Sequence, residues 1–306
     1  MKHSCTDVEF LNKDYLELVE SKEYQLGRRM FTAFNLIKKG KIIALTKRTI
    51  NFIRTRKYSN HPTNSIDFSK NINLTNKKIA VYTCMAGDYD YIRKPKFISN
   101  NCDYYLITDV DTKYNVYTKK KISKALKEKY NHNPILINRY YKMHPFDLFK
   151  DYDYAIYVDS NVEIISDISK LIKDINEDYG LSFHACSNMN CIYDEIKSYS
   201  ILKKGNYKQM KIQAKRYKYE KFPKKNGMLD CNVIVFDLHN LNAMKIAYDW
   251  WDEYLKSESL RDKLSIPYVL WKNKVPVIEL TGLGSNIYKN PIVRVNKKHK
   301  NKYKYK

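Results

Sequence analysis

The sequence predicts an α/β fold in which a largely parallel sheet is flanked by helices. From residue 77 onward, short apolar runs of strand type alternate with segments of helical spacing, which is the pattern of strands joined by helices. The first run, KKIAVYTCM (77–85), is apolar almost throughout, as is typical of a parallel strand buried on both faces. A hydrophobic content of 43% over 306 residues is sufficient for a sizeable core.

Residues 1–75 are predicted to form a basic, helical N-terminal extension and linker, separate from a domain at 76–306. The segment LNKDYLELVESKEY (11–24) has helical spacing. Basic residues then fill the gaps between apolar positions, as Lys38, Lys39, Lys41, Lys47, Arg48, Arg54, Arg56 and Lys57. Such a segment suits an anionic membrane surface or a protein partner, and packing on the chain's own core is an equal alternative. A polar linker, YSNHPTNSIDFSKNINLTN (58–76), follows.

The domain continues with further strand-type and helical segments. Strands are expected, in order, at CDYYLITDV (102–110), YAIYVDSN (154–161), LSFHACS (181–187), NVIVFDL (232–238) and KVPVIEL (274–280). Helical segments are expected around KISKALKEKY (121–130) and YYKMHPFDLF (140–149). This order favours a sheet whose first strands are joined by helical crossovers.

Three of these strands end in polar residues: Gly87-Asp88, Thr108-Asp109 and Asp159-Ser160-Asn161. In open α/β sheets ligands bind outside the carboxyl ends of the strands. The loop with Gly87 would let the backbone approach a nucleotide, and Asp109, after the next strand, would suit a ribose or base edge. The D-x-D-like pair of Asp159 and Asn161 would suit a divalent cation. Together these features describe a nucleotide-sugar site, although each alone is also an ordinary turn.

The formal net charge is +23, which favours an anionic partner such as a phosphate-rich small molecule, an anionic membrane or nucleic acid. A second basic cluster spans residues 203–225, where Glu220 is the only acid, and the tail VNKKHKNKYKYK (295–306) is basic to its end. A solvated lysine surface is an equal explanation for the tail.

The cysteines have no CxxC pair or metal-finger spacing; they are Cys5, Cys84, Cys102, Cys186, Cys191 and Cys231. Several lie in apolar runs, as buried thiols do. The charged N-terminus resembles no signal peptide, and no apolar stretch is long enough to span a bilayer. We therefore expect a cytoplasmic protein, with a peripheral membrane location as an option.

Four blocks resemble one known family over roughly residues 77–285. They are NRYYKMHPFDLFKDYDYAIYVDSNVEI (138–164), SFHACSNMNCIYDEI (182–196), MLDCNVIVFDLHN (228–240) and WWDEYLKSESLRDKLSIPYVL (250–270). The family, long catalogued as a domain of unknown function, is grouped with glycosyltransferase-like proteins of the GT-A fold. Its members include plant mucilage- and pectin-related proteins and bacterial polysaccharide proteins.

The resemblance implies a GT-A-type, Rossmann-like fold with a mixed, mainly parallel sheet. It also implies sugar transfer from a nucleotide-sugar donor, with a UDP-sugar as the first candidate, to a glycan or lipid-linked glycan. The family usually uses a divalent metal, Mn²⁺ or Mg²⁺, at its D-x-D-like motif. This chain departs from the family pattern at several places. Asn161 stands where a second carboxylate is expected, Asp230 where a Glu is expected, Phe236 where an Arg is expected and Lys263 where a Gln is expected. The basic residues expected between His184 and Cys191 are also missing.

For the donor, we expect Asp159 and Asn161 to contact the metal and the diphosphate. Arg139 and Lys142 are one helical turn apart and suit phosphate neutralisation, or else a solvated helix face. His299, in the tail, is a candidate third metal ligand or a solvated histidine. Gly87, Asp88 and Asp109 are the candidates for nucleotide binding.

For the transfer step, an inverting reaction needs a carboxylate that accepts the proton of the attacking hydroxyl. Asp230 is the preferred base, and Asp262 is preferred for contact with the sugar or acceptor, with a role as helix cap as its alternative. Glu195 is a third candidate and otherwise an exposed helix residue. His184 is expected either to touch the sugar or acceptor or to be a satisfied core histidine.

Two other functional classes remain open on the sequence. A nucleic-acid-binding protein would suit the charge and the interleaved Tyr and Lys, yet no helix-turn-helix, zinc-finger or RNP-type motif is present. A hydrolase on the same scaffold, such as a lipid amidase, lacks a G-x-S-x-G or H-E-x-x-H motif. Nucleic acid is therefore the less favoured partner, and glycosyl transfer is the leading hypothesis.

Overall fold

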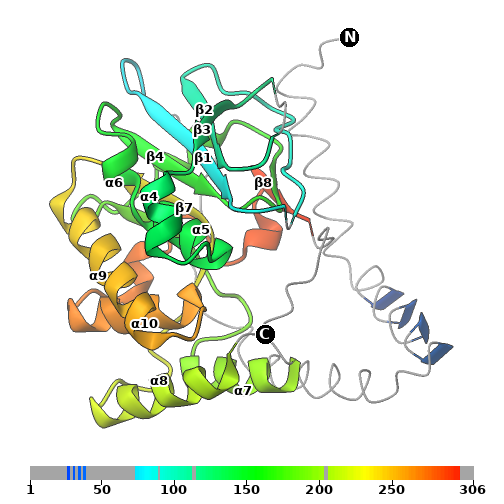
Figure 1. Ribbon diagram of the computed structural model, residues 1–306, viewed down its shortest axis with the longest axis vertical. Coiled ribbons are helices and arrows are strands. Elements are labelled where there is room, and N and C mark those ends of the chain that lie inside the picture. The colour runs from blue at the N-terminus through cyan, green and yellow to red at the C-terminus, as the bar shows by residue number, and fades with distance from the viewer. Residues whose placement is uncertain are drawn as a thin grey trace.

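The computed structural model describes residues 73–296, apart from 89, 112–114 and 203–205, and also describes a few residues between 26 and 38 (Figure 1). These few residues are 26, 27, 30, 31, 34, 35, 37 and 38, and all are helical. Most of the predicted N-terminal extension therefore lies outside the described residues. Within the described part of the chain, no helix is long and apolar enough to cross a membrane.

The core of the domain is a six-stranded sheet with the order β3-β2-β1-β4-β7-β6. Its strands are β1 (Ile79–Met85), β2 (Cys102–Thr108), β3 (Thr118–Lys121), β4 (Tyr154–Val158), β6 (Leu181–Ala185) and β7 (Leu229–Asp237). Strands β1 to β4 pair in parallel, whereas β7 runs antiparallel to both β4 and β6. The expected mixed, mainly parallel sheet is confirmed, and the start of β7 lies at the same edge as the ends of β1 and β4.

Helices and short elements complete the domain. The helices are α4 (Lys124–Lys129), α5 (Pro134–Met143), α6 (Pro145–Leu148), α7 (Ile192–Leu202), α8 (Tyr207–Tyr219), α9 (Leu241–Ser257) and α10 (Asp262–Lys272). Single 3-10 turns are η1 (Ile168–Ile172), η2 (Val277–Leu280) and η3 (Ile287–Lys289). A small second sheet pairs β5 (Val162–Ile164) antiparallel with β8 (Val293–Val295).

The central strands are buried on both faces. In β1, Ala80 and Tyr82 pack into a core with Trp250 of α9, whereas Ile79 and Val81 pack into a second core that contains residues of η1, β5 and β8. A strand covered on both faces needs apolar side chains at successive positions. This is why the first strand reads as a continuous apolar run rather than an alternating one.

Helix α5 begins and ends with local signals that its sequence contains. The Asn133 side chain caps its first turn by accepting from the Ile135 and Leu136 amides at 3.0 and 3.3 Å, and Pro134 occupies the first helical position. At its end, His144 Nδ1 contacts the Tyr140 carbonyl at 2.7 Å. These caps set the register in which α5 presents its inner face to the sheet.

One strand prediction is wrong: KVPVIEL (274–280) contains the 3-10 turn η2, not a strand. Pro276 is the residue before η2 and has no N–H to donate to a sheet ladder. A short apolar run cannot by its pattern be distinguished from a buried turn. The segment still contributes Val277 and Leu280 to the core.

Candidate functional site

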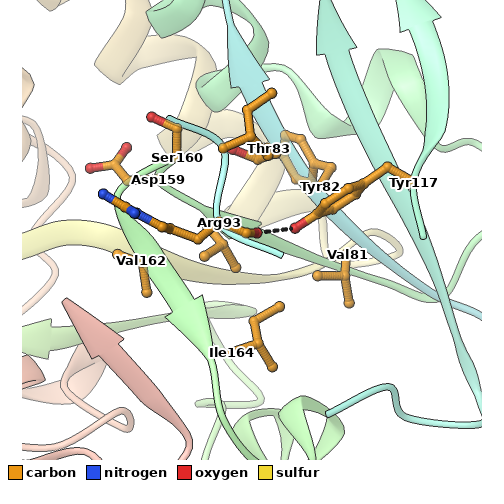
Figure 2. Close-up of a pocket in the computed structure, with 11 residues that line it drawn as sticks. Val81, Tyr82, Thr83, Arg93, Tyr117, Asp159, Ser160, Val162 and Ile164 are labelled. Carbon is orange, nitrogen blue, oxygen red and sulfur yellow. Dashed lines mark hydrogen bonds between the residues drawn. The ribbon is translucent and has the colours of Figure 1, made fainter. Parts of the chain in front are cut away.

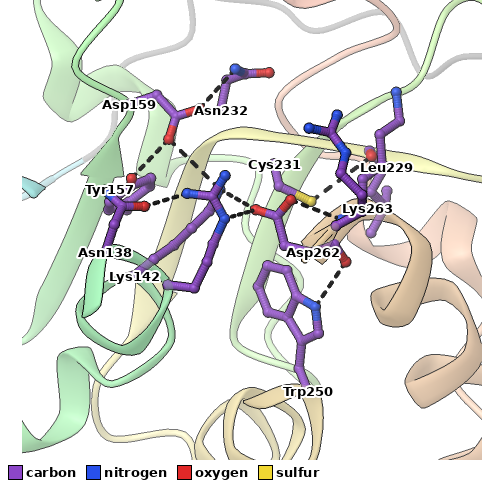
Figure 3. A network of polar contacts seen from close by, with 12 residues as sticks. Asn138, Lys142, Tyr157, Asp159, Leu229, Cys231, Asn232, Trp250, Asp262 and Lys263 are labelled. Carbon is purple, nitrogen blue, oxygen red and sulfur yellow. Dashed lines mark hydrogen bonds and ion pairs between the residues drawn. The ribbon is translucent and has the colours of Figure 1, made fainter. Parts of the chain in front are cut away.

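Figure 3 shows that Asp159, one of the polar residues predicted at the carboxyl edge of the sheet, lies near side chains of α5, β7 and α10. Asp159 directly follows β4, and Asn232 lies in the first half of β7. Asp262 is the first residue of α10, whose N-cap residue is Arg261. Arg261 rather than Asp262 is the N-cap residue, but Asp262 Oδ1 accepts a hydrogen bond from the Lys263 backbone amide in the first turn at 3.0 Å. The other carboxylate oxygen, Oδ2, faces the two basic side chains of α5.

Asp159 is held by β4 and β7 together. Its Oδ1 accepts a hydrogen bond from the Tyr157 hydroxyl at 2.8 Å, and its Oδ2 accepts one from Asn232 Nδ2 at 2.8 Å. The backbone amide of Asp159 donates to the Asn232 carbonyl, also at 2.8 Å. The side chain remains 21% exposed, so this oriented carboxylate can still be reached by a ligand.

Asp262 lies in a buried ion-pair cluster with the two basic residues predicted on α5. Lys142 Nζ lies 2.7 Å and Arg139 Nε 2.9 Å from Asp262 Oδ2, and the Lys142 side chain is only 1% exposed. Both basic side chains face the site, so the alternative of a solvated helix face is wrong. Burial alone would raise the pKa of Asp262, but Arg139 and Lys142 hold that pKa well below its usual range.

Lys142 also joins the two carboxylates of the site. Its Nζ lies 3.7 Å from Asp159 Oδ1 as well as 2.7 Å from Asp262 Oδ2. A buried ammonium between two carboxylates fixes the distance between them and places positive charge at the end of β4. Phosphate oxygens that approach Asp159 would meet this charge.

A second ion-pair cluster contains Lys263, the next residue of α10. Its Nζ lies 2.7 Å from Asp230 Oδ1, 3.7 Å from Glu195 Oε1 and 2.9 Å from Cys186 Sγ. Burial would lower the pKa of Lys263, but the Asp230 carboxylate raises that pKa well above its ordinary value. The structure therefore brings Asp230 and Glu195, both predicted as catalytic candidates, to one cation beside Asp262.

His184 lies in the core rather than at the surface of this site. The residue is 0% exposed, and its Nε2 lies 2.9 Å from Asn290 Nδ2. Its Nδ1 has no hydrogen-bond partner among the described residues, and burial lowers the pKa of His184 to about 4. The burial disfavours the prediction that His184 touches a substrate and favours the core alternative.

Acidification should destabilise the protein through His184. The neutral ring stays unprotonated in the folded state down to about pH 4, whereas the unfolded chain takes up the proton near pH 6.5. Stability is therefore lost as the pH falls, by about 2 kcal/mol between pH 7 and 5. Urea unfolding at both pH values should show a smaller loss in His184→Gln than in the wild type. The exposed His239, changed to Gln, serves as the control, and equal losses in all three proteins would contradict this account.

On the nucleotide side, the loop after β1 is tied to the end of β2. Gly87 has a φ of +73°, which glycine adopts without strain. Its amide donates to Asp109 Oδ1 at 2.8 Å, and Lys127 Nζ lies 2.9 Å from Asp109 Oδ2. Asp109 thus shapes the loop, and Asp88 is exposed beside it. The three candidates for nucleotide binding are close to one another at this edge.

Figure 2 shows a small cavity between the ends of β1 and β4 that the sequence analysis missed. Its volume is about 10 Å³, room for a single water molecule. Thr83, Arg93, Tyr117 and Asp159 are among its lining residues, and the Arg93 side chain extends toward Asp159. The Tyr117 hydroxyl donates to the Arg93 carbonyl at 2.9 Å. Because Arg93 and Tyr117 come from irregular loops, no periodic pattern pointed to them.

The oxygen atoms at the end of β4 fit a divalent cation in part. Asp159 offers a carboxylate and Asn161 an amide oxygen, and hard cations such as Mg²⁺ take their other ligands from phosphates and water. Among the described residues, no group of three or more His, Cys, Asp and Glu could hold a metal. The backbone amide of Asn296 donates to the backbone carbonyl of Asn161 at 2.8 Å. The described part of the chain therefore ends at residue 296, beside Asn161. His299 lies outside the described residues.

Comparisons with curated proteins find only short local matches. The Ypt/Rab-type GTPase Rab7 of Gibberella zeae is 37% identical over 57 residues, which is 19% of this chain and 28% of that protein. The Ras-related protein RABG3b of Arabidopsis thaliana is 35% identical over 48 residues, 16% of this chain and 24% of that protein. The chain thus spans about a quarter of the length of these relatives, which is too little to assign a family.

Solved structures of glycosyltransferases show distant resemblances. Mouse xyloside xylosyltransferase 1 in its apo form has a TM-score of 0.38 at 9% identity. The alignment covers 65% of this chain and 82% of the xylosyltransferase chain. The mannosyltransferase Ktr4p from S. cerevisiae has a TM-score of 0.37 at 10% identity. This alignment covers 76% of this chain and 75% of the Ktr4p chain. Scores this low do not establish a shared activity.

A family model covers most of the chain. The model of the TOD1/MUCI70, glycosyltransferase-like domain matches residues 30–293. The match includes both ion-pair clusters, the end of β4 and all six strands of the main sheet. It also agrees with the resemblance that the sequence blocks indicated. The chain belongs to the TOD1/MUCI70 glycosyltransferase-like family.

Proposed function

We propose that the protein is a glycosyltransferase that moves a sugar from a nucleotide-sugar donor to a glycan or lipid-linked glycan. The observation that best supports this proposal is the arrangement at the end of β4. There the reachable carboxylate of Asp159 lies next to the buried Lys142, and Lys142 pairs in turn with Asp262. Family membership supports the same class of reaction. A UDP-sugar is the first donor to test.

The donor diphosphate would bind at Asp159 and Asn161. Lys142 lies 3.7 Å from Asp159 and, together with Arg139, would stabilise the negative charge of the phosphates. A divalent cation, Mn²⁺ or Mg²⁺, held by Asp159 and Asn161 would neutralise the diphosphate as it leaves. Tyr157 and Asn232 orient Asp159 through its two oxygens, which keeps the carboxylate in one rotamer.

The donor sugar would lie against Asp262, and the acceptor against Asp230. In an inverting transfer the acceptor oxygen bonds to the anomeric carbon, and the bond from this carbon to the diphosphate breaks. The acceptor proton passes to Asp230 on the opposite face of the sugar. Lys263 lies 2.7 Å from Asp230, so it orients this carboxylate. Asp262 and Lys263 are consecutive at the start of α10, so the two proposed subsites would lie side by side.

Donor binding can be tested by thermal shift with UDP-, GDP-, CMP- and dTDP-sugars, each with and without Mn²⁺. A ligand at a hundredfold excess over its Kd should stabilise the fold by about 2.7 kcal/mol, or about 5 °C. We expect a metal-dependent rise for one nucleotide that Asp159→Ala abolishes. The exposed Asp252, changed to Ala, removes a carboxylate away from the site and should retain the rise.

The alternatives give different results in the same screen. No rise with any donor, together with binding to RNA or DNA that weakens steeply with salt, would indicate a nucleic-acid-binding protein. A rise that persists in Asp159→Ala would place the donor elsewhere on the molecule. Either outcome would overturn the proposed role of this sheet edge.

A further inference from the structure

The exposed charged side chains of helix α8 are all basic. Its residues 208, 211, 215 and 218 are lysines with exposed side chains, and the basic surface continues into the following loop. The exposed lysines of this surface, which we call the α8 basic face, are Lys208, Lys211, Lys215, Lys218, Lys221, Lys224 and Lys225. Figure 1 shows α7 and α8 at the end of the domain remote from β2 and β3.

The positive charge of this face is not compensated within the described part of the chain. None of its seven lysines forms an ion pair there. Glu220, the acid nearest to them in sequence, pairs instead with Arg216 and Lys272 and accepts from the Tyr268 hydroxyl. Like charges at helical spacing repel one another. A face of this kind is therefore electrostatically matched to an anionic surface.

The inner side of α8 anchors the helix to the domain. Met210, Gln213 and Tyr217 are buried, and the Tyr217 ring stacks on that of Tyr268 at 3.9 Å between centroids. The Asn206 side chain caps the first turn by accepting from the Gln209 amide at 3.3 Å. Because the inner side is packed and capped, the lysines project from a rigid support.

Two large apolar side chains are exposed among these lysines. Ile212 is 52% and Tyr219 89% exposed, and at 100° per residue both lie on the same side of α8 as Lys208 and Lys215. Lysine chains with interspersed aliphatic and aromatic side chains suit the interface of a bilayer. There the apolar groups enter the headgroup layer and the ammonium groups meet lipid phosphates.

We propose that the α8 basic face docks the protein on a membrane surface rich in anionic lipids. A glycan would need a concave site with hydrogen-bond acceptors, whereas this face is convex and offers ammonium groups. The exposed Ile212 and Tyr219 favour lipid over nucleic acid, which offers no apolar layer to enter. The loop after α8 leads directly to β7, which contains Asp230. If Asp230 contacts the acceptor as proposed, docking through α8 would hold the membrane on the element that precedes the acceptor strand in the chain. The docking surface itself goes beyond the proposed transfer reaction.

Flotation of the full chain with vesicles tests this proposal. We expect binding to phosphatidylcholine vesicles that contain 30% phosphatidylglycerol, and little binding to phosphatidylcholine alone. Reversing four charges of the face should weaken the binding by at least about a hundredfold; the changes are Lys208→Glu, Lys211→Glu, Lys215→Glu and Lys218→Glu. A matched variant reverses four exposed lysines elsewhere and should bind nearly as the wild type does: Lys94→Glu, Lys124→Glu, Lys129→Glu and Lys256→Glu.

A third variant, Ile212→Ser with Tyr219→Ser, leaves the charge unchanged. It should lose vesicle affinity by about tenfold or more because it removes the apolar insertion. Equal vesicle binding by the two charge-reversal variants would overturn the proposal. It would also be overturned if the face variant lost affinity for duplex RNA but not for vesicles, since the face would then be a nucleic-acid surface. The nucleotide thermal shift of each variant reports donor binding separately.

Discussion

Replacing Asp262 by Asn is expected to lower the free energy of unfolding by about 3–5 kcal/mol, because it leaves the buried Lys142 and the part-buried Arg139 without their shared carboxylate. Lys142 is 1% exposed and would retain only Asp159, 3.7 Å away. Arg139 would lose the carboxylate that lies 2.9 Å from its Nε. Urea unfolding of the variant and the wild type at pH 7 measures this loss directly.

The double variant Lys142→Met with Asp262→Leu separates the charge effect from packing. Replacing a buried ion pair by apolar residues of similar size is often neutral for stability, so the part of the loss that comes from Lys142 should be recovered, whereas Arg139 still lacks the Asp262 carboxylate. Sugar transfer should be absent in the double variant, because the proposed contacts of Lys142 and Asp262 with the donor are gone. A double variant no more stable than Asp262→Asn would show that the unpaired charge of Lys142 does not cause the loss.

Replacing Asp230 by Asn is expected to reduce sugar transfer by about 10²–10⁴-fold, the usual contribution of a general base. The amide keeps the shape of the side chain but cannot accept the proton. The thermal shift with the donor nucleotide should persist, because Asp159 and Lys142 are unchanged. Comparing the turnover number with the nucleotide-induced shift in the same preparation measures both effects.

Glu195→Gln provides the comparison within the same cluster. Glu195 lies 3.7 Å from Lys263, whereas Asp230 lies 2.7 Å from it, so the Glu195 variant should lose less activity. If Asp230→Asn retained full transfer and Glu195→Gln were inactive, Glu195 rather than Asp230 would be the base. Loss of the nucleotide shift in Asp230→Asn would instead indicate a contribution to donor binding.

The sequence by itself determined the features that are encoded by nearby residues. The apolar runs of β1, β2 and β4 predicted buried strands, and the polar residues after them predicted a site at one edge. Arg139 and Lys142 are three residues apart, and the structure places both beside Asp262. The strand predictions are confirmed, and the two basic side chains face the sheet edge, because strand burial, helical spacing and capping depend on short stretches of chain; the site itself stays a prediction.

Only the tertiary structure decided which distant residues meet. The antiparallel pairing of β7 with β4 brings Asn232 to Asp159 and places Asp230 at the same edge. The same packing buries His184. Its position near the end of a strand had left open whether it contacts the sugar or acceptor or lies in the core. Neither the direction of β7 nor the loops that place Arg93 and Tyr117 have a local signature in the sequence. Contacts between segments far apart in the chain depend on how the whole core packs, so residue patterns alone could not reveal this part of the site.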